Sequence, residues 1–272
     1  MKLRRTLMLW AGIFFLTTNA LDARAQAIQT GKRYEDMSRQ ERLLFVGEQA
    51  RRIAREISGS EYEFTTDFET DIQKAVTHYT QRIGIGGDRR GKTDLRVVME
   101  RGQAQAPTLI AVFKARNVSP LIGLYLPWIE SEYINIQEPS PMGAIGMFQF
   151  LPSTGERYGL STDDLSDVGK CADAAARYII DSMQTFSSDP MKEALALLAY
   201  NRGAEKTARE LKVLLNEQNK RCSICALTAD RSKLDETFRS ESVFYVPRFF
   251  AAAIIGENPQ VFGLQMQPLS SR

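Results

Sequence analysis

A single glutamate near the middle of the chain stands where a carboxyl group could do acid–base chemistry. Glu130 ends a mostly apolar segment that begins at Ser119 and Pro120, two residue types typical of a helix start. At 100° per residue, Gly123, Pro127 and Glu130 share a narrow arc beside a wide apolar face. Apolar surroundings raise the pKa of a carboxyl group, which lets a glutamate act as a general acid near neutral pH.

The segment around Glu130 leaves other interpretations open. Glu130 could be a solvated charge at a helix end, and Glu132 is a rival acid that falls inside the apolar arc if the helix continues that far. Glu138 and Glu156 are further candidates that we interpret as surface charges. Gly123 leaves room for a ligand or another backbone, and Pro127 should kink the helix because it cannot donate to the carbonyl of Gly123.

Four short motifs occur in order through this part of the chain. They are ES at 130–131, GAIGMFQ at 143–149, PST at 152–154 and AYN at 199–201. Together they resemble the soluble lytic transglycosylase (SLT) family over about residues 95–265. YVPRF at 245–249 and ENP at 257–259 make the chain most similar to the catalytic domain of the membrane-bound lytic murein transglycosylase D type.

The resemblance implies an enzyme that cleaves the β-1,4 bond between N-acetylmuramic acid and N-acetylglucosamine in peptidoglycan and leaves a 1,6-anhydro sugar. By position, Glu130 is then the single catalytic acid and base. Tyr200 is expected to orient Glu130 or the substrate, and Gln149 to bond a sugar. The implied substrate-binding residues are Ser131, Gly143, Ala144, Gln149, Tyr200 and Asn201. Arg202 replaces a small residue of the family pattern, which could alter the preference for substrate charge.

Peptidoglycan glycan strands are therefore the expected partner, and we expect no cofactor, metal, nucleic acid or nucleotide. The alternative functions are a hydrolytic muramidase on the same scaffold and a protein that binds peptidoglycan without cleaving it. A partner in an envelope complex is possible, and the sequence does not identify it. The chain has one histidine, His78, which argues against a multi-histidine metal site. A Ser-His-Asp triad would have to use this residue.

Apolar residues recur at helical spacing through most of the chain, and the resemblance implies a lysozyme-like domain. We therefore predict a mainly α fold. Helices are expected within 26–83 and near 95–116, 120–133, 171–186, 190–200, 203–218 and 247–256. The predicted divisions are a helical N-terminal region with a basic linker at 26–94, a lysozyme-like catalytic domain at 95–265 and a tail at 266–272.

The first 25 residues are typical of a cleavable signal peptide. Lys2, Arg4 and Arg5 precede an apolar stretch at 7–16 that is too short to span a bilayer. Small residues at 23 and 25 predict cleavage after Ala25, with Ala27 as an alternative site and an uncleaved anchor as an alternative outcome. The remaining chain is close to neutral, so non-specific nucleic-acid binding is not expected. We predict a periplasmic protein.

Two further motifs carry little functional weight. GGDRRGKT at 86–93 fits the phosphate-loop pattern, but helical residues precede it where that loop needs a buried strand, so we interpret it as an exposed basic linker. Cys222 and Cys225 form a lone Cys-x-x-Cys that we interpret as a local structural disulfide after export. Free thiols, a redox pair, or pairing of Cys171 with one of the two remain alternatives.

Overall fold

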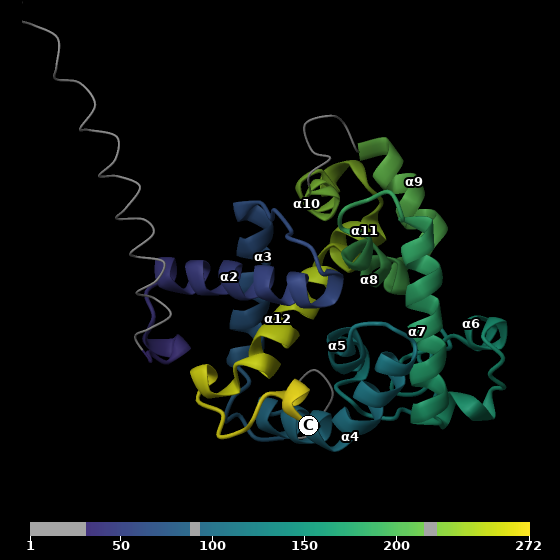
Figure 1. Cartoon of the computed structure of the whole chain (residues 1–272), viewed down its shortest axis with the longest axis horizontal. Coiled ribbons are helices and arrows are strands. Elements are labelled where there is room, and N and C mark those ends of the chain that lie inside the picture. The colour runs from purple at the N-terminus through teal and green to yellow at the C-terminus, as the bar shows by residue number, and fades with distance from the viewer. Residues whose placement is uncertain (1–30, 88–92, 215–221) are drawn as a thin grey trace, which may run out of the picture.

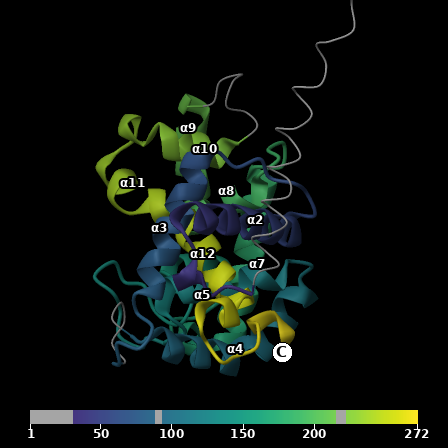
Figure 2. The ribbon, with the colours of Figure 1, turned by 90° about the vertical axis from the view of Figure 1, so that its left-hand side faces the viewer.

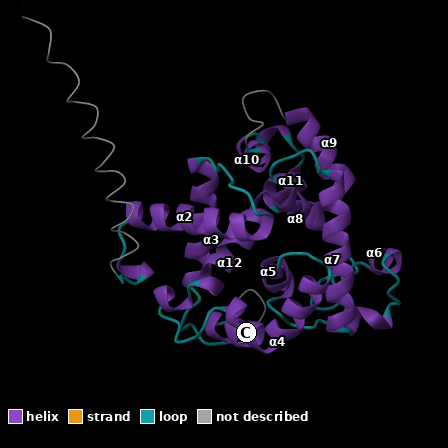
Figure 3. Cartoon of the chain, viewed as in Figure 1, coloured by secondary structure: helices purple, strands orange, loops and turns teal. Residues whose placement is uncertain are grey.

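The computed structural model describes residues 31–87, 93–214 and 222–272, and within these ranges it contains helices and loops but no strand (Figures 1 and 3). The helices are α2 Arg39–Ser58, α3 Thr66–Thr80, α4 Leu95–Ala115, α5 Pro120–Ser131, α6 Pro152–Arg157, α7 Val168–Thr185, α8 Lys192–Arg202, α9 Ala204–Leu214, α10 Ser223–Ala229, α11 Glu236–Ser240 and α12 Tyr245–Glu257. Short 3₁₀ turns are η1 Tyr34–Asp36, η2 Asp163–Ser166, η3 Arg231–Lys233, η4 Ser242–Phe244, η5 Pro259–Phe262 and η6 Leu269–Ser271.

The prediction of a mainly α fold is confirmed. The long helices follow the expected ranges, whereas α6, α10 and α11 were not predicted because five to seven residues are too few to show a helical period. Helix α8 begins at Lys192, so Pro190 lies in the turn before it rather than at its first position. The predicted signal peptide and residues 88–92 of the predicted basic linker lie outside the described residues.

Helix α12 forms the centre of the molecule. Its sequence is apolar on every side, and every residue except Arg248 is buried, as expected for a helix surrounded by protein. It packs against α3, α5, α2 and α8, and it runs between them in both orthogonal views (Figures 1 and 2). Residues distant in sequence therefore meet around the first turn of α12.

The N-terminal helices belong to the same hydrophobic core. Ser38 caps α2 in a reciprocal arrangement with Glu41, which sets the start of that helix. The predicted apolar stripes of α2 and α3 are buried, with Val46 and Ile72 fully enclosed. Both helices pack on α12, and α2 also contacts α5. Helices α2 and α3 thus pack around α5, the helix that carries Glu130, directly through α2 and through the shared neighbour α12.

Helices α4, α5 and α12 approach one another closely at two glycines. A Cβ at Gly123 would lie 2.4 Å from the ring of Phe113, so this glycine makes room for an aromatic side chain of α4 rather than for a ligand or another backbone. A Cβ at Gly256 would lie 2.3 Å from the ring of Tyr125. These close approaches hold the first half of α5 against both α4 and α12.

Cys222 and Cys225 form a disulfide at the start of α10, as we predicted, while Cys171 is a buried free thiol in α7. The alternative pairing through Cys171 is therefore wrong. The element before the phosphate-loop-like sequence is helix α3, whereas such a loop requires a strand there. None of the described helices has the length and apolar character needed to cross a bilayer.

Candidate active site

Glu130 lies in the last turn of α5, where it meets the first residue of α12. The hydroxyl of Tyr245 donates a hydrogen bond to Oε1 of Glu130. Burial raises the pKa of Tyr245 well above its ordinary value, and the charge of Glu130 and their hydrogen bond add to the rise. Tyr245 therefore stays protonated at neutral pH and keeps a proton to donate to Glu130.

Tyr200, in α8, supports the loop beside Glu130. Its hydroxyl donates to the backbone carbonyl of Phe148 at 3.0 Å, and its ring packs against Phe150 and Tyr178 at centroid distances of 5.8 and 5.2 Å. Burial raises the pKa of Tyr200 well above its usual range, with the Glu130 charge as the next cause. Tyr200 thus lies within the electrostatic reach of Glu130 while its hydroxyl anchors the loop.

Ser131 connects the same loop to α5, the helix that carries Glu130. Its side chain is fully buried, and its hydroxyl lies 2.7 Å from the carbonyl of Met147 and 3.2 Å from that of Pro127. A buried serine with these two partners serves the backbone rather than a ligand. In the structure, Ser131 therefore holds the 134–151 loop against α5.

The 134–151 loop closes on itself through a two-residue antiparallel bridge between Ile145 and Phe150. Gly146 lies inside that turn with φ of +79°, and a Cβ there would be 2.1 Å from the carbonyl oxygen of Leu165. Only glycine meets both conditions without strain. The tight turn therefore fixes the path of the loop that Ser131 joins to α5.

The remaining predicted residues of the loop are placed mainly by backbone contacts. Gly143 has φ of +83°, and its amide donates to the carbonyl of Ser140. The amide of Ala144 donates to the Ser140 hydroxyl at 3.0 Å. Gln149 has φ of +50°, and its side-chain amide donates to the Gly146 carbonyl at 2.8 Å. The side chain of Gln149 therefore provides a hydrogen-bond donor to the loop backbone.

Asn201 lies at the exposed end of α8, where its side-chain oxygen accepts a hydrogen bond from the Ser242 hydroxyl at 2.8 Å. The next residue, Arg202, turns inward: its side chain is only 2% exposed and forms ion pairs with Glu210 and Asp235. Its guanidinium is therefore committed inside the protein, and the expectation that it alters the preference for substrate charge is not supported.

The rival acid Glu132 is turned away into a buried ion pair. It follows the end of α5 with φ of +55°, and its Oε1 lies 2.7 Å from Nη1 of Arg82, with both side chains less than 10% exposed. Glu138 and Glu156 are exposed, as predicted. Within the described ranges, no three His, Cys, Asp or Glu side chains are grouped as a metal site would require.

Tyr245 and Ser242 contact site residues and were not predicted as members of the site. Tyr245 belongs to the YVPRF stretch at 245–249, which indicated similarity but gave no role to the tyrosine. Its position more than one hundred residues after Glu130 hides the contact from any local pattern. The available signal was a phenol at the start of an otherwise apolar helix, since a buried tyrosine needs a hydrogen-bond partner.

Residues 108–221 match the family model described as Transglycosylase SLT domain. No curated protein matches the chain in sequence. The match supports an SLT-type, lysozyme-like domain and an enzyme of the lytic transglycosylase class with peptidoglycan as its substrate. The matched range contains Glu130, the 134–151 loop and Tyr200, and it ends before Tyr245.

Proposed function

We propose that the chain is a peptidoglycan lytic transglycosylase that cleaves the β-1,4 bond between N-acetylmuramic acid and N-acetylglucosamine and forms 1,6-anhydro ends. The family match supports transglycosylase activity in general. The observation that supports Glu130 as the acid is the hydrogen bond that it accepts from Tyr245, whereas the bond cleaved and the anhydro product are proposed from the motif resemblance. A hydroxyl that donates to a carboxylate stabilises it after its proton has left, which favours the transfer of that proton to a substrate.

In the first step, protonated Glu130 gives its proton to the bridging oxygen as the bond from that oxygen to C1 of the muramyl residue breaks. The bonding electron pair leaves with the oxygen, and the carbonyl oxygen of the sugar's own acetamido group bonds to C1. Glu130 becomes a carboxylate at this stage, with the Tyr245 hydroxyl already oriented toward Oε1. The preformed donor therefore acts where negative charge develops.

In the second step, the Glu130 carboxylate takes the proton of the C6 hydroxyl of the same muramyl residue. The C6 oxygen bonds to C1, and the acetamido oxygen leaves C1. Glu130 ends the cycle protonated and no water is consumed. One carboxyl group serves both steps, in agreement with a site where Glu132 is paired with Arg82 and where Glu138 and Glu156 are exposed.

Three narrower assignments rest on sequence. The YVPRF stretch supports similarity to the membrane-bound lytic murein transglycosylase D type. The features of residues 1–25 support export to the periplasm through a cleavable signal peptide, which N-terminal sequencing of the exported protein would test. We retain 95–265 as the catalytic domain, with 26–94 as its helical N-terminal region and 266–272 as a tail.

The decisive experiment is digestion of purified peptidoglycan sacculi by the mature protein, followed by mass spectrometry of the released fragments. Glu130→Gln removes the titrating group and nearly preserves its shape. Glu138→Gln is the matched control, because it makes the same change at an exposed site in the neighbouring loop. We expect anhydro-muropeptides from the parent and from Glu138→Gln, and none from Glu130→Gln.

Each other outcome points to a different function. Reducing-end products would indicate a hydrolytic muramidase. Equal release by the parent and Glu130→Gln would remove Glu130 as the acid. Binding of sacculi without release by the parent would indicate a non-catalytic peptidoglycan-binding protein.

A further inference from the structure

The segment that leads into Tyr245 is attached to the end of α8 at two points. We call residues 235–244 the strap; it contains α11 and η4. At its start, Asp235 pairs with Arg202, and near its end Ser242 donates to Asn201 at 2.8 Å. The strap then continues directly into Tyr245, the donor to Glu130. The position of the strap thus bears on the position of that donor.

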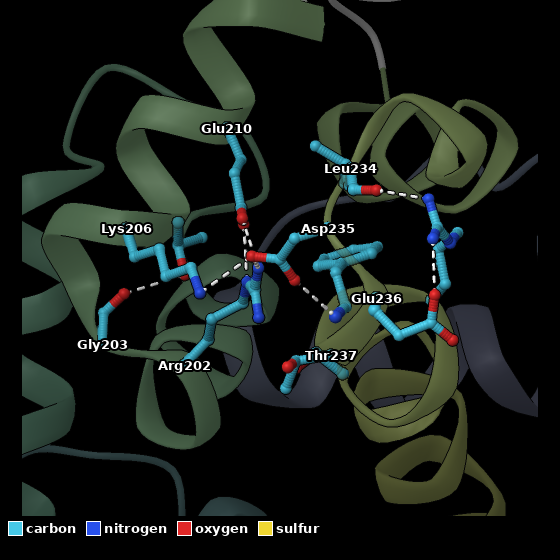
Figure 4. Close-up of polar contacts among 12 residues, drawn as sticks. Arg202, Gly203, Lys206, Glu210, Leu234, Asp235, Glu236 and Thr237 are labelled. Carbon is cyan, nitrogen blue, oxygen red and sulfur yellow. Dashed lines mark hydrogen bonds and ion pairs between the residues drawn. The ribbon is translucent and has the colours of Figure 1, made fainter.

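Arg202 is the centre of the first attachment, as Figure 4 shows. Its Nε donates to Oε2 of Glu210 at 2.7 Å, and its Nη2 donates to Oε1 of the same carboxylate and to Asp235 at 2.6 Å. Its guanidinium carbon also lies 5.1 Å from the ring centroid of Phe238, in α11. One side chain of α8 therefore binds both α9 and the strap.

Asp235 transmits this attachment to the strap backbone. Its Oδ1 accepts from the amide of Phe238 at 2.8 Å and so caps α11, while its Oδ2 accepts from Arg202. Lys206, in α9, contributes a second cation at 2.9 Å. The start of α11 is consequently held at a defined place beside α8 (Figure 4).

We propose that Arg202 is a positioning residue that, through Asp235 and the strap, holds the Tyr245 hydroxyl against Glu130. The proposal rests on the proposed function and extends it, because it assigns control of the acid–base group to a residue whose side chain is 2% exposed and paired with Glu210 and Asp235. Arg202 follows the AYN motif directly, so the same helix end carries Tyr200, Asn201 and the strap anchor.

The geometry requires arginine rather than a positive charge alone. A planar guanidinium can bind one carboxylate through two nitrogens, reach a second carboxylate and lie over a ring. An ammonium group offers one nitrogen and a different shape. Arg202→Lys therefore keeps the charge, leaves Glu210 and Asp235 with a cation, and removes the three-way attachment, which makes it the informative variant.

The test combines a spectroscopic measurement with kinetics on purified full-length mature protein. Tyrosine labelled with ¹³C at Cζ reports the hydrogen bonding of each hydroxyl, and Tyr245→Phe identifies the Tyr245 signal. Arg202→Lys and Asp235→Asn are compared with Arg209→Lys, a matched change in α9 at a side chain that is 70% exposed. Asp235→Asn retains an oxygen that can cap α11. Thermal unfolding is recorded for every variant.

We expect the Tyr245 signal to shift in Arg202→Lys and in Asp235→Asn, and to stay unchanged in Arg209→Lys. The kcat for anhydro-muropeptide release should fall about 10-fold in Arg202→Lys with KM within about twofold, since the loss concerns a contact to the acid rather than binding. The double variant Arg202→Lys/Tyr245→Phe should be no slower than Tyr245→Phe alone, because both changes remove one interaction.

An unchanged Tyr245 signal in Arg202→Lys would overturn the proposal, as would losses in kcat that multiply in the double variant. A fall in unfolding temperature without a Tyr245 shift would show that Arg202 only stabilises the fold. If the parent releases no anhydro-muropeptides, the proposed function fails, but the Tyr245 signal still decides whether Arg202 positions the hydroxyl.

Discussion

Replacement of Tyr245 by phenylalanine isolates the contact on which the proposed chemistry depends. The change removes one hydroxyl and keeps a ring that is 1% exposed in the core. The lost group is the donor to Oε1 of Glu130. Because the carboxylate form of Glu130 appears only as its proton moves to the leaving oxygen, the missing hydrogen bond should raise the barrier more than it weakens substrate binding.

The size of the effect follows from the charge on the acceptor. A hydrogen bond to an ionised group contributes about 1.5–3 kcal/mol. Each ~1.4 kcal/mol corresponds to a tenfold change in rate, so kcat should fall about 10- to 150-fold. KM should stay within about twofold, and the free energy of unfolding should fall by about 1 kcal/mol, since the ring remains packed.

The assay follows anhydro-muropeptide release over a range of sacculus concentrations, with urea unfolding in parallel. Tyr158→Phe is a matched control: it removes the hydroxyl of another buried tyrosine that donates to a carboxylate other than Glu130, in this case Asp181 of α7 at 2.9 Å. We expect kcat of Tyr158→Phe to stay within about twofold of the parent. A Tyr245→Phe enzyme with the kcat of the parent would refute the reasoning.

Two further predictions concern the elements that place the site. Gly146→Ala should lower the free energy of unfolding by at least about 2 kcal/mol, because a Cβ would lie 2.1 Å from the Leu165 carbonyl at φ of +79°. Gly159→Ala, at φ of +78° with open space around it, should lower it by less in the same urea titration. Equal losses in the two variants would contradict the clash. Arg82→Met removes the buried partner of Glu132 and should lower the free energy of unfolding by about 3–5 kcal/mol. Arg55→Met, the same change in the exposed Arg55–Glu61 pair, should lower it by about 1 kcal/mol or less. Similar losses in the two variants would argue against a buried ion pair.

Local periodicity was enough to predict the elements that carry the site. The apolar face of α5 and the stripes of α2 and α3 follow a period of 3.6 residues over three turns or more, so their burial could be predicted. The end of α5 could not be predicted. It depends on Glu132 taking φ of +55° and pairing with Arg82, a contact across fifty residues.

The roles of several site residues could not be predicted from local patterns, because these roles also depend on contacts between distant parts of the chain. The motifs marked Ser131, Gln149 and Tyr200, but their partners are backbone carbonyls of the 134–151 loop, and the path of that loop is set by tertiary packing. Arg202 stood out as an exception to the family pattern, yet its partners Glu210 and Asp235 lie on later elements. Sequence spacing identifies residue types near a site, whereas the direction of each side chain is decided by the chain segments that fold onto it.

The environment of Glu130 is larger than the range of the family match. The match ends at residue 221, whereas the donor to Glu130 is the first residue of α12 and the strap that leads to it occupies 235–244. Helix α12 also fills the core between α5 and the N-terminal helices α2 and α3. Since a carboxyl group is useful as an acid only where its surroundings control its proton, the packed elements that position Glu130 extend from α2 through α12.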